Sequence, residues 1–331
     1  MGSMSNTLVI GGAGYIGSHV AKALVENGQP PIVLDNLSGG SAKCLPKSAP
    51  FYKGDMADTE LLKHLFQKYQ IDTVMNLAGL IAVEESVIEP QKYYQTNVLK
   101  TTELIDCLIE SEIPDFIFSS SCAVYGSPES LPMTESHPFS PQSPYGKNKL
   151  VIEHLLSDYA RAHPHFDYVS LRYFNASGAA SDSAIGECHD PETHLIPLIF
   201  QALSHPENPI IIRGVDYPTP DGTCIRDYVH VSDIAQAHLK AADYLKKGHK
   251  SQAFNLGNGE GVSVKEMIQY IEKMTGLKVP VQHGERRMGD PAKLIGSNAL
   301  AKETLGWFPE HSKIEIILET AWKWHLKCHQ K

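Results

Sequence analysis

The sequence predicts an α/β protein whose main domain is a doubly wound parallel sheet, followed by a smaller mixed α/β domain. Two observations predict the sheet: short apolar runs alternate with helical patterns, and a glycine-rich turn directly follows the first run. The alternation is lost after Asn175, which indicates a change of domain. We expect residues 5–178 to form the first domain and 179–331 the second, with some later segments returning to the first.

The first strand and helix predict a Rossmann-type dinucleotide site. Apolar residues 7–10 indicate a buried strand, and a helical pattern begins at Ser18. Between them, three glycines let the backbone turn sharply, approach a pyrophosphate and pack the helix on the sheet. The helix start adds free N–H donors and the positive end of a dipole. The residues of this turn that we expect to bind the cofactor are Gly11, Gly14, Tyr15, Ile16 and Gly17.

An acidic side chain follows the second predicted strand, residues 31–34. Asp35 lies 18 residues after Gly17, with Asn36 beside it, where a carboxylate accepts hydrogen bonds from an adenosine ribose. The same carboxylate would repel a 2′-phosphate. The sequence therefore favours NAD over NADP, held in part by Asp35 and Asn36.

The third strand, residues 51–54, is followed by Asp55 and Met56, where adenine can be contacted. Asp55 has a second interpretation, because Asp is a good N-cap and a helical pattern spans 59–69. Both interpretations stay open at this stage.

Small and polar residues follow the next two strands. The run 73–79 ends in Leu77, Ala78 and Gly79, which would let a cofactor lie against the backbone. A helical pattern then spans 90–110 and contains Asn97, either as a buried hydrogen-bonding group that contacts the cofactor or as a solvated side chain. A fifth strand, 116–118, leads into Ser119, Ser120 and Ser121, and ligands of such sheets bind outside the carboxyl ends of the strands.

An amphipathic helix is predicted to begin near Tyr145, and this places Tyr145 and Lys149 one turn apart on the same face. A phenol with an ordinary pKa of about 10 is a poor base at neutral pH, and a neighbouring cation favours the phenolate. A Tyr and a Lys four residues apart are common on ordinary helices. The preceding dinucleotide pattern makes a catalytic pair the better hypothesis.

These features together resemble the UDP-glucose 4-epimerases of the extended short-chain dehydrogenase/reductase superfamily. The first-half motifs are typical of the superfamily, and the second-half motifs are typical of the epimerases. The motifs are Gly11–His19, Asp35-Asn36, Ala78-Gly79-Leu80, Ser119–Ser121 with Val124-Tyr125-Gly126, Tyr145-Gly146-Lys147, Leu171–Asn175, Asp216–Thr223, Arg226–Val231, Arg286-Arg287 and Gly289-Asp290.

The resemblance implies that UDP-glucose and UDP-galactose are interconverted through a 4-keto intermediate, with NAD bound throughout. Tyr145 would take the proton of the sugar 4-hydroxyl, and Ser121 would hydrogen-bond the reacting oxygen. Lys149 would lower the phenol pKa and hold the nicotinamide ribose. Ser119 and Tyr173 would complete the cofactor site.

The resemblance also implies a substrate site in the second half of the chain. Arginines suit diphosphate oxygens because their donors form a fork, and an Asp accepts ribose hydroxyls. Each Arg could equally form a surface salt bridge. The implied substrate-binding residues are Ser121, Tyr145, Asn175, His194, Leu195, Arg226, Arg287, Asp290 and Leu294.

Two positions depart from the family pattern. Ile81 stands where many members have a Lys near the nicotinamide ribose, and Leu294 is a medium-sized residue where the sugar pocket is bounded. A 4-epimerase of UDP-N-acetylglucosamine, UDP-glucuronate or a UDP-pentose is therefore the main alternative. A nucleotide-sugar dehydratase is disfavoured, since Cys122 and Ala123 stand where such enzymes need an acid–base pair.

Composition limits the partners and the compartment. The net charge of −9 argues against binding nucleic acid or an anionic membrane, and no apolar run is long enough to span a bilayer. Six cysteines without a Cys-x-x-Cys pair fit a reducing compartment, so we expect a cytoplasmic protein, and the resemblance suggests a homodimer. His189 and His194 could suggest a metal, but we expect none, because no further ligands follow at a suitable spacing.

Overall fold

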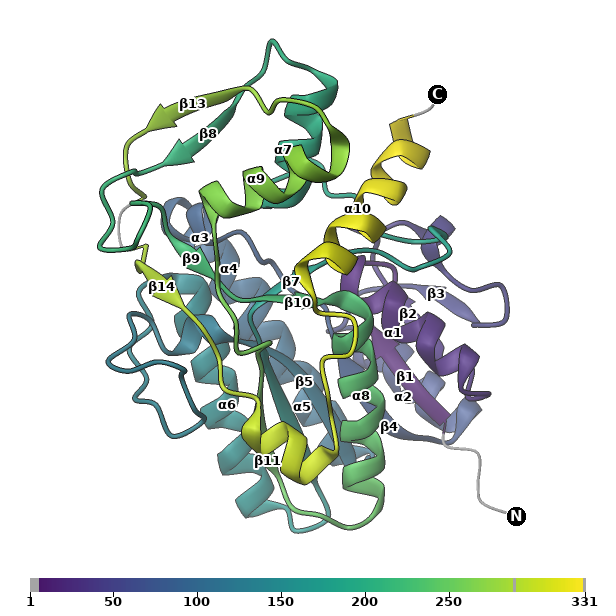
Figure 1. Cartoon of the computed structure of the whole chain (residues 1–331). Coiled ribbons are helices and arrows are strands. Elements are labelled where there is room, and N and C mark those ends of the chain that lie inside the picture. Colours follow the sequence, from purple (N-terminus) through teal and green to yellow (C-terminus); the bar gives the residue numbers. More distant parts are fainter. Residues whose placement is uncertain (1–5, 288–289, 330–331) are drawn as a thin grey trace.

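A seven-stranded parallel sheet forms the centre of the computed structural model, which describes residues 6–287 and 290–329. The strand order is β11-β6-β5-β4-β1-β2-β3, so the chain reverses direction across the sheet between β1 and β4 (Figure 1). This is the Rossmann order, which confirms the predicted fold class. The strands are β1 (Asn6–Ile10), β2 (Ile32–Asp35), β3 (Phe51–Lys53), β4 (Ile71–Asn76), β5 (Asp115–Ser121), β6 (Asp167–Tyr173) and β11 (Gln252–Leu256).

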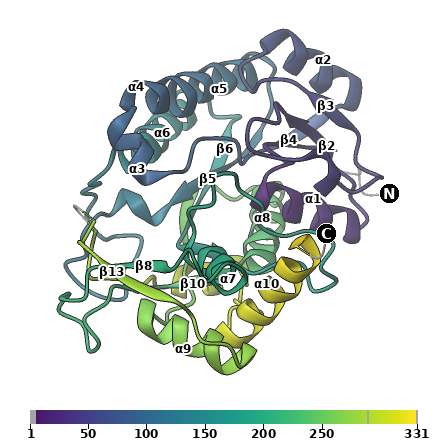
Figure 2. The same ribbon diagram turned by 90° about the horizontal axis from the view of Figure 1, so that it is seen from above.

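Helices cover both faces of the sheet, because its strands are buried on both sides. In β1, Val9 packs into one core, whereas Leu8 and Ile10 pack into the other. Figure 2 shows the two helical layers on opposite sides of the strands. One layer holds α1 (Tyr15–Glu26) and α8 (Val231–Lys246); the other holds α2 (Thr59–Tyr69), α5 (Lys100–Glu110) and α6 (Pro144–Ala162).

The pattern predicted as one helix over 90–110 is divided in the structure. It consists of α4 (Pro90–Tyr93), a π-helical segment η2 (Tyr94–Leu99) and α5, and a short helix α3 (Val83–Ile88) precedes it. The wider turn of η2 buries both Asn97 and Val98. The sequence pattern could not reveal this π-helical turn. One extra residue in the turn rotates the following side chains to another face, and the amino-acid composition does not show such a rotation.

A second group of elements packs around its own core beyond the sheet, at the top of Figure 1. Ile199, Ile212 and Ile271 are among the buried residues that join these elements. They are α7 (Leu195–Ser204), β8 (Ile210–Arg213), α9 (Val264–Thr275), β13 (Val281–Gly284) and α10 (Ile314–His329). Ser263 and Glu266 cap α9 reciprocally.

Short strands and turns connect the two groups. β7 follows β6 almost directly in the chain and pairs in parallel with β10. β9 pairs with β12 and with β14. The connecting strands are β7 (Asn175–Ser177), β9 (Ile225–Arg226), β10 (Tyr228–His230), β12 (Val262–Ser263) and β14 (Lys293–Leu294). Three short helical segments lie elsewhere: the 3-10 helices η1 (Ala42–Cys44) and η3 (Cys122–Val124), and the π-helical η4 (Ala301–Leu305).

The second half of the chain contributes to both groups. β11 lies at the edge of the main sheet beside β6, and α8 packs against α1 and the sheet. The division at residue 178 stays a prediction. Among the described residues, no helix has the length and apolar character needed to cross a membrane.

Candidate active site

The glycine turn between β1 and α1 fits a dinucleotide. A Cβ at Gly17 would lie 2.1 Å from the Gly11 carbonyl oxygen, and one at Gly11 would lie 2.5 Å from the Ala78 backbone nitrogen. Both positions therefore exclude any side chain. Gly14 is the N-cap of α1, which has no side-chain cap and no acidic residue in its first turn. Its end is thus suited to an anion such as pyrophosphate.

Asp35 is fixed beside this turn. Its Oδ2 accepts a hydrogen bond from the Ala13 N–H at 2.9 Å, and its Oδ1 accepts one from the Leu37 N–H at 2.7 Å. Each carboxylate oxygen has a second lone pair, so Asp35 can still accept hydrogen bonds from ribose hydroxyls. This arrangement fits a dinucleotide that carries a free 2′-hydroxyl.

Asp55 lies close to Asn36, as a shared cofactor site requires. Its Oδ2 receives hydrogen bonds from Lys100 Nζ at 2.6 Å and Asn36 Nδ2 at 3.4 Å. Burial disfavours the charged form, but Lys100 and the Ala57 N–H hold the Asp55 pKa below its usual value. The interpretation of Asp55 as the cap of α2 is wrong, because Asp58 accepts the Leu61 N–H there.

Asn97 orders the loop that follows β4. Its Oδ1 accepts the Leu80 N–H at 2.8 Å, and its Nδ2 donates to the Leu80 carbonyl at 3.0 Å. Of the two interpretations of Asn97, the structure therefore shows the buried hydrogen-bonding one. Ala78 and Gly79 precede this loop, and Ile81, which departs from the family pattern, is 47% exposed.

Tyr145, Lys149 and Ser121 meet at the carboxyl end of β5. Helix α6 begins at Pro144 because the Ser143 hydroxyl accepts the Gly146 N–H. Lys149 Nζ lies 5.8 Å from the centre of the Tyr145 ring and donates to the Ser119 carbonyl at 2.7 Å. The Ser121 side chain hydrogen-bonds Tyr145.

Burial is the main influence on the pKa values of Tyr145 and Lys149. It raises the Tyr145 pKa to about 12, while the hydrogen bond from Ser121 acts in the opposite direction. It lowers the Lys149 pKa to about 8, and the nearby Glu153 carboxylate opposes that change. Lys149 Nζ lies close to the Tyr145 ring but donates to the Ser119 carbonyl, so the lowering of the Tyr145 pKa by Lys149 stays a prediction.

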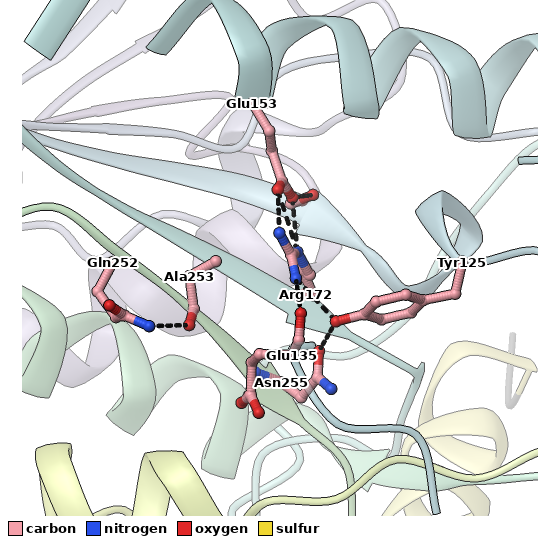
Figure 3. Close-up of polar contacts among 8 residues, drawn as sticks. Tyr125, Glu135, Glu153, Arg172, Gln252, Ala253 and Asn255 are labelled. Carbon is pink, nitrogen blue, oxygen red and sulfur yellow. Dashed lines mark hydrogen bonds and ion pairs between the residues drawn. The ribbon is translucent and has the colours of Figure 1, made fainter. Parts of the chain in front are cut away.

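A buried ion pair lies beneath these residues. Arg172 Nε lies 2.9 Å and 3.1 Å from the two carboxylate oxygens of Glu153, and both side chains are 6% exposed (Figure 3). Ser120 also donates to Glu153, and Arg172 donates to the Tyr125 hydroxyl. Asn255 of β11 accepts from that hydroxyl (Figure 3). Glu153 was missed from the sequence, although its spacing of four residues from Lys149 puts both on one helix face.

The residues expected at the substrate are only partly gathered. Arg226 pairs with Asp290, and Leu294 of β14 lies beside Arg226 in the β9 pairing. Asn175 begins β7, directly beyond the end of β6, where Tyr173 lies opposite Ser121. In contrast, Arg287 Nε pairs with Glu84 of α3 at 2.7 Å, and Gly289 of the shared motif lies outside the described residues.

His194 and Leu195 stand at the start of α7. His194 is the N-cap, and its Nδ1 lies 2.7 Å from Glu187 Oε1 and 3.1 Å from Glu192 Oε1. Burial lowers the His194 pKa, but the two carboxylates outweigh it and raise that pKa to about 10. Sequence reasoning named His189 and His194 here but missed both glutamates.

Comparison with known proteins identifies the family. The model of the NAD dependent epimerase/dehydratase family matches residues 7–257. The chain belongs to this family. It is similar to the UDP-glucose 4-epimerase of Halalkalibacterium halodurans, with 46% identity over 96% of this chain and 95% of that protein.

Solved structures of the family have the same fold over nearly the whole chain. The UDP-glucose 4-epimerase of Brucella ovis in complex with NAD is 46% identical, with a TM-score of 0.93 over 96% of this chain and 98% of that one. The UDP-Glc/GlcNAc 4-epimerase of Campylobacter jejuni is 39% identical, with a TM-score of 0.85 over 98% of this chain and 100% of that one. These matches confirm the resemblance, the fold class and NAD as the cofactor.

The glycine turn yields a prediction about NAD retention. Gly17→Ala should purify with little bound NAD and be less stable by about 1–3 kcal/mol, because the new methyl group collides with the Gly11 carbonyl. Gly39→Ala is the control, since a Cβ there would have nothing within 4 Å. The measurement is chromatography of the nucleotide released on denaturation, with a urea unfolding curve. Recovery of mainly NADP from the parent would contradict the role of Asp35.

The buried ion pair yields a prediction about stability. Glu153→Gln should lower the free energy of unfolding by about 3–5 kcal/mol, because it leaves the Arg172 guanidinium buried and uncompensated. The double variant Glu153→Gln/Arg172→Met should be less destabilised than the single one. Urea unfolding followed by circular dichroism measures both. Equal stability of Glu153→Gln and the parent protein would show that the pair contributes nothing.

Proposed function

We propose that this protein interconverts UDP-glucose and UDP-galactose by inverting carbon 4 of the sugar, with NAD retained throughout the cycle. The observation that carries the proposal is the meeting of Tyr145, Ser121 and Lys149 beside the dinucleotide turn. The relatives similar over nearly the full chain are named UDP-glucose 4-epimerases, which supports the same substrates here.

In this proposal Tyr145 moves the proton. The phenolic oxygen removes the proton of the 4-hydroxyl and returns it when the hydroxyl is restored, while Ser121 donates a hydrogen bond to the reacting oxygen. Bound NAD would supply a hydride acceptor for carbon 4 that also returns the hydride, so that the cycle would involve no net oxidation. Between the two transfers the 4-keto sugar turns over in the site. Throughout the cycle, Lys149 holds the nicotinamide ribose and supplies positive charge near the phenol.

The substrate nucleotide is assigned to the residues beyond the sheet. Arg226 has five donors in a fixed fork, and its pairing with Asp290 orients the guanidinium for diphosphate oxygens. Arg287 would have to leave Glu84 to bind the same group. The remaining residues assigned to the substrate are Asn175, His194, Leu195 and Leu294.

A dehydratase of the same fold is the second candidate, and the residues after Ser121 oppose it. Cys122 begins the turn η3, and burial raises the pKa of its thiol to about 12, so it is neutral at physiological pH. Ala123 has no titratable group. Elimination of water from the sugar needs an acid and a base at this place, and neither residue provides one.

The proposal is tested with UDP-sugars in the absence of added NAD. The parent protein should convert UDP-glucose to UDP-galactose, read by NMR, and Tyr145→Phe should lose about a thousandfold or more in turnover while still binding the substrate. Tyr159→Phe is the control and should keep full turnover, because Tyr159 is on the same helix but its hydroxyl donates a hydrogen bond to Asp106. Turnover of Tyr145→Phe within threefold of the parent would mean that another group is the base. A 4-keto-6-deoxy product would favour the dehydratase.

The range of sugars is assigned to Leu294. An aliphatic side chain selects by volume, which separates close analogues by only about 1–3 kcal/mol, so the N-acetylated pair should react more slowly but measurably. Leu294→Tyr should suppress that reaction selectively, because the ring would fill the space of the acetamide. The measurement is the ratio of kcat/KM for the two sugars, with Leu277→Tyr as an exposed control. An unchanged ratio would show that Leu294 does not line the sugar pocket.

We further propose a homodimer in a reducing, cytoplasmic compartment. Apolar side chains are exposed on and near α3, where Val87 and Ile88 are 61% and 79% exposed, and Leu99 follows on η2. A second copy of the chain would bury this surface. No disulfide joins the cysteines that the structure describes, which fits the compartment.

The dimer yields a prediction about this surface. Val87→Glu should convert the protein from dimer to monomer in light scattering coupled to gel filtration, because a charge would be buried at the interface. Leu277→Glu, exposed on another part of the chain, should leave the mass unchanged. A monomeric parent protein would refute the dimer, and a dimeric Val87→Glu would place the interface elsewhere.

A further inference from the structure

Four potential metal ligands converge in the segment between β7 and α7. They are Glu187, His189, Glu192 and His194, whose ligand atoms all lie within 4.8 Å of one another. Glu187 Oε1 lies 3.2 Å from His189 Nδ1 and 2.7 Å from His194 Nδ1. Glu192 Oε1 lies 4.0 Å and 3.1 Å from the same two nitrogens.

These distances are close to the edges of a small coordination tetrahedron. With zinc–nitrogen and zinc–oxygen bonds of about 2.0–2.2 Å, the ligand atoms of a tetrahedral site lie about 3.3–3.6 Å apart. The four measured separations fall on both sides of that range. Movement of the side chains by less than about 1 Å would therefore create a regular site.

The fold positions the two carboxylates before any ion binds. The side chains of Glu187 and Glu192 are 7% and 5% exposed. Glu192 Oε1 accepts hydrogen bonds from the backbone N–H groups of Thr193 and His194, and the Glu187 carbonyl accepts one from the Trp324 indole of α10. His189 and His194 are more exposed, which gives an ion access from solvent.

The surroundings favour a positive charge at this place. Two nearly buried carboxylates lie next to Tyr15, the first residue of α1, whose ring packs edge-on against His189. Buried carboxylates need compensation, and one divalent cation supplies it with both imidazoles neutral. Nitrogen and oxygen donors in this number suit Zn²⁺ and related transition ions better than Mg²⁺ or Ca²⁺, which prefer oxygen alone.

We propose that Glu187, His189, Glu192 and His194 bind one divalent transition-metal ion, with Zn²⁺ the best fit. The ion fixes the segment 187–194 between the start of α1, α10 and the first turn of α7. Its role is structural: it binds Nδ1 of His194 and so fixes this residue, which the proposed function assigns to the substrate, at the start of α7. The sequence predicted no metal because the two histidines lacked partners, and the tertiary structure supplies those partners as glutamates.

The test uses the full chain without an affinity tag, stripped of metal by a chelator. Calorimetric titration with Zn²⁺ should show one equivalent per chain, and the melting temperature should rise when the ion is bound. Co²⁺ in its place should give the visible absorption of a four-coordinate nitrogen and oxygen site. Absence of binding by the parent protein would overturn the proposal and would leave an ion-paired cluster only.

Substitutions locate the site. Glu187→Gln and His189→Asn should each weaken binding on the order of 100-fold or more, whereas Glu207→Gln, in the exposed His205–Glu207 pair, should have no effect. Cys188→Ser should also bind normally, because the exposed thiol of Cys188 is not a ligand. Retained binding in both site variants, or loss of binding in Cys188→Ser, would overturn the assignment. If a variant does not fold, the titration and Co²⁺ spectrum of the parent protein still decide. Sugar conversion is read separately, so failure here leaves the proposed epimerase reaction intact.

Discussion

The buried pair of Glu153 and Arg172 is the interaction on which the active site depends. Glu153 belongs to α6 and Arg172 to β6, so the pair fixes the helix that carries Tyr145 and Lys149 to the sheet. Ser120 extends the contact to β5, and the Tyr125 hydroxyl extends it to Asn255 of β11. The two buried charges compensate each other, and neutral partners take up their remaining hydrogen-bonding groups, so the loss of either charge would leave the other uncompensated.

The same burial that orders the site also sets its electrostatics. Removal from water raises the pKa of the Tyr145 phenol and lowers that of the Lys149 ammonium, so burial disfavours the charged form of both groups. The Glu153 carboxylate, one turn further along α6, opposes the lowering of the Lys149 pKa. A phenol that takes a proton from a sugar hydroxyl and later returns it needs a pKa that is not far from the working pH. Its hydrogen bond to Ser121 and the nearby cation are the available means of stabilising the phenolate.

The cofactor side is organised by close backbone approach together with the carboxylate of Asp35. Gly11 and Gly17 permit contacts that no other residue allows, and Asp35 ties the glycine turn to the loop after β2 through the N–H groups of Ala13 and Leu37. The second half of the chain reaches the same edge of the sheet. Tyr15 donates to the Gly178 carbonyl, which places the segment before α7 next to the dinucleotide turn.

The sequence by itself determined the doubly wound parallel sheet, the glycine turn, Asp35 and the Tyr145–Lys149 helix, because each rests on local spacing or on a short strand–turn–helix pattern. The tertiary structure alone decided the π-helical turn that buries Asn97, the cap at Asp58 instead of Asp55, and the engagement of Arg226 with Asp290 and of Arg287 with Glu84. It also brought Glu187 and Glu192 to the two histidines. These contacts join residues whose partners are chosen by packing. Spacing along the chain places side chains on one face of a helix or strand, but it does not show which side chains of different elements or loops meet.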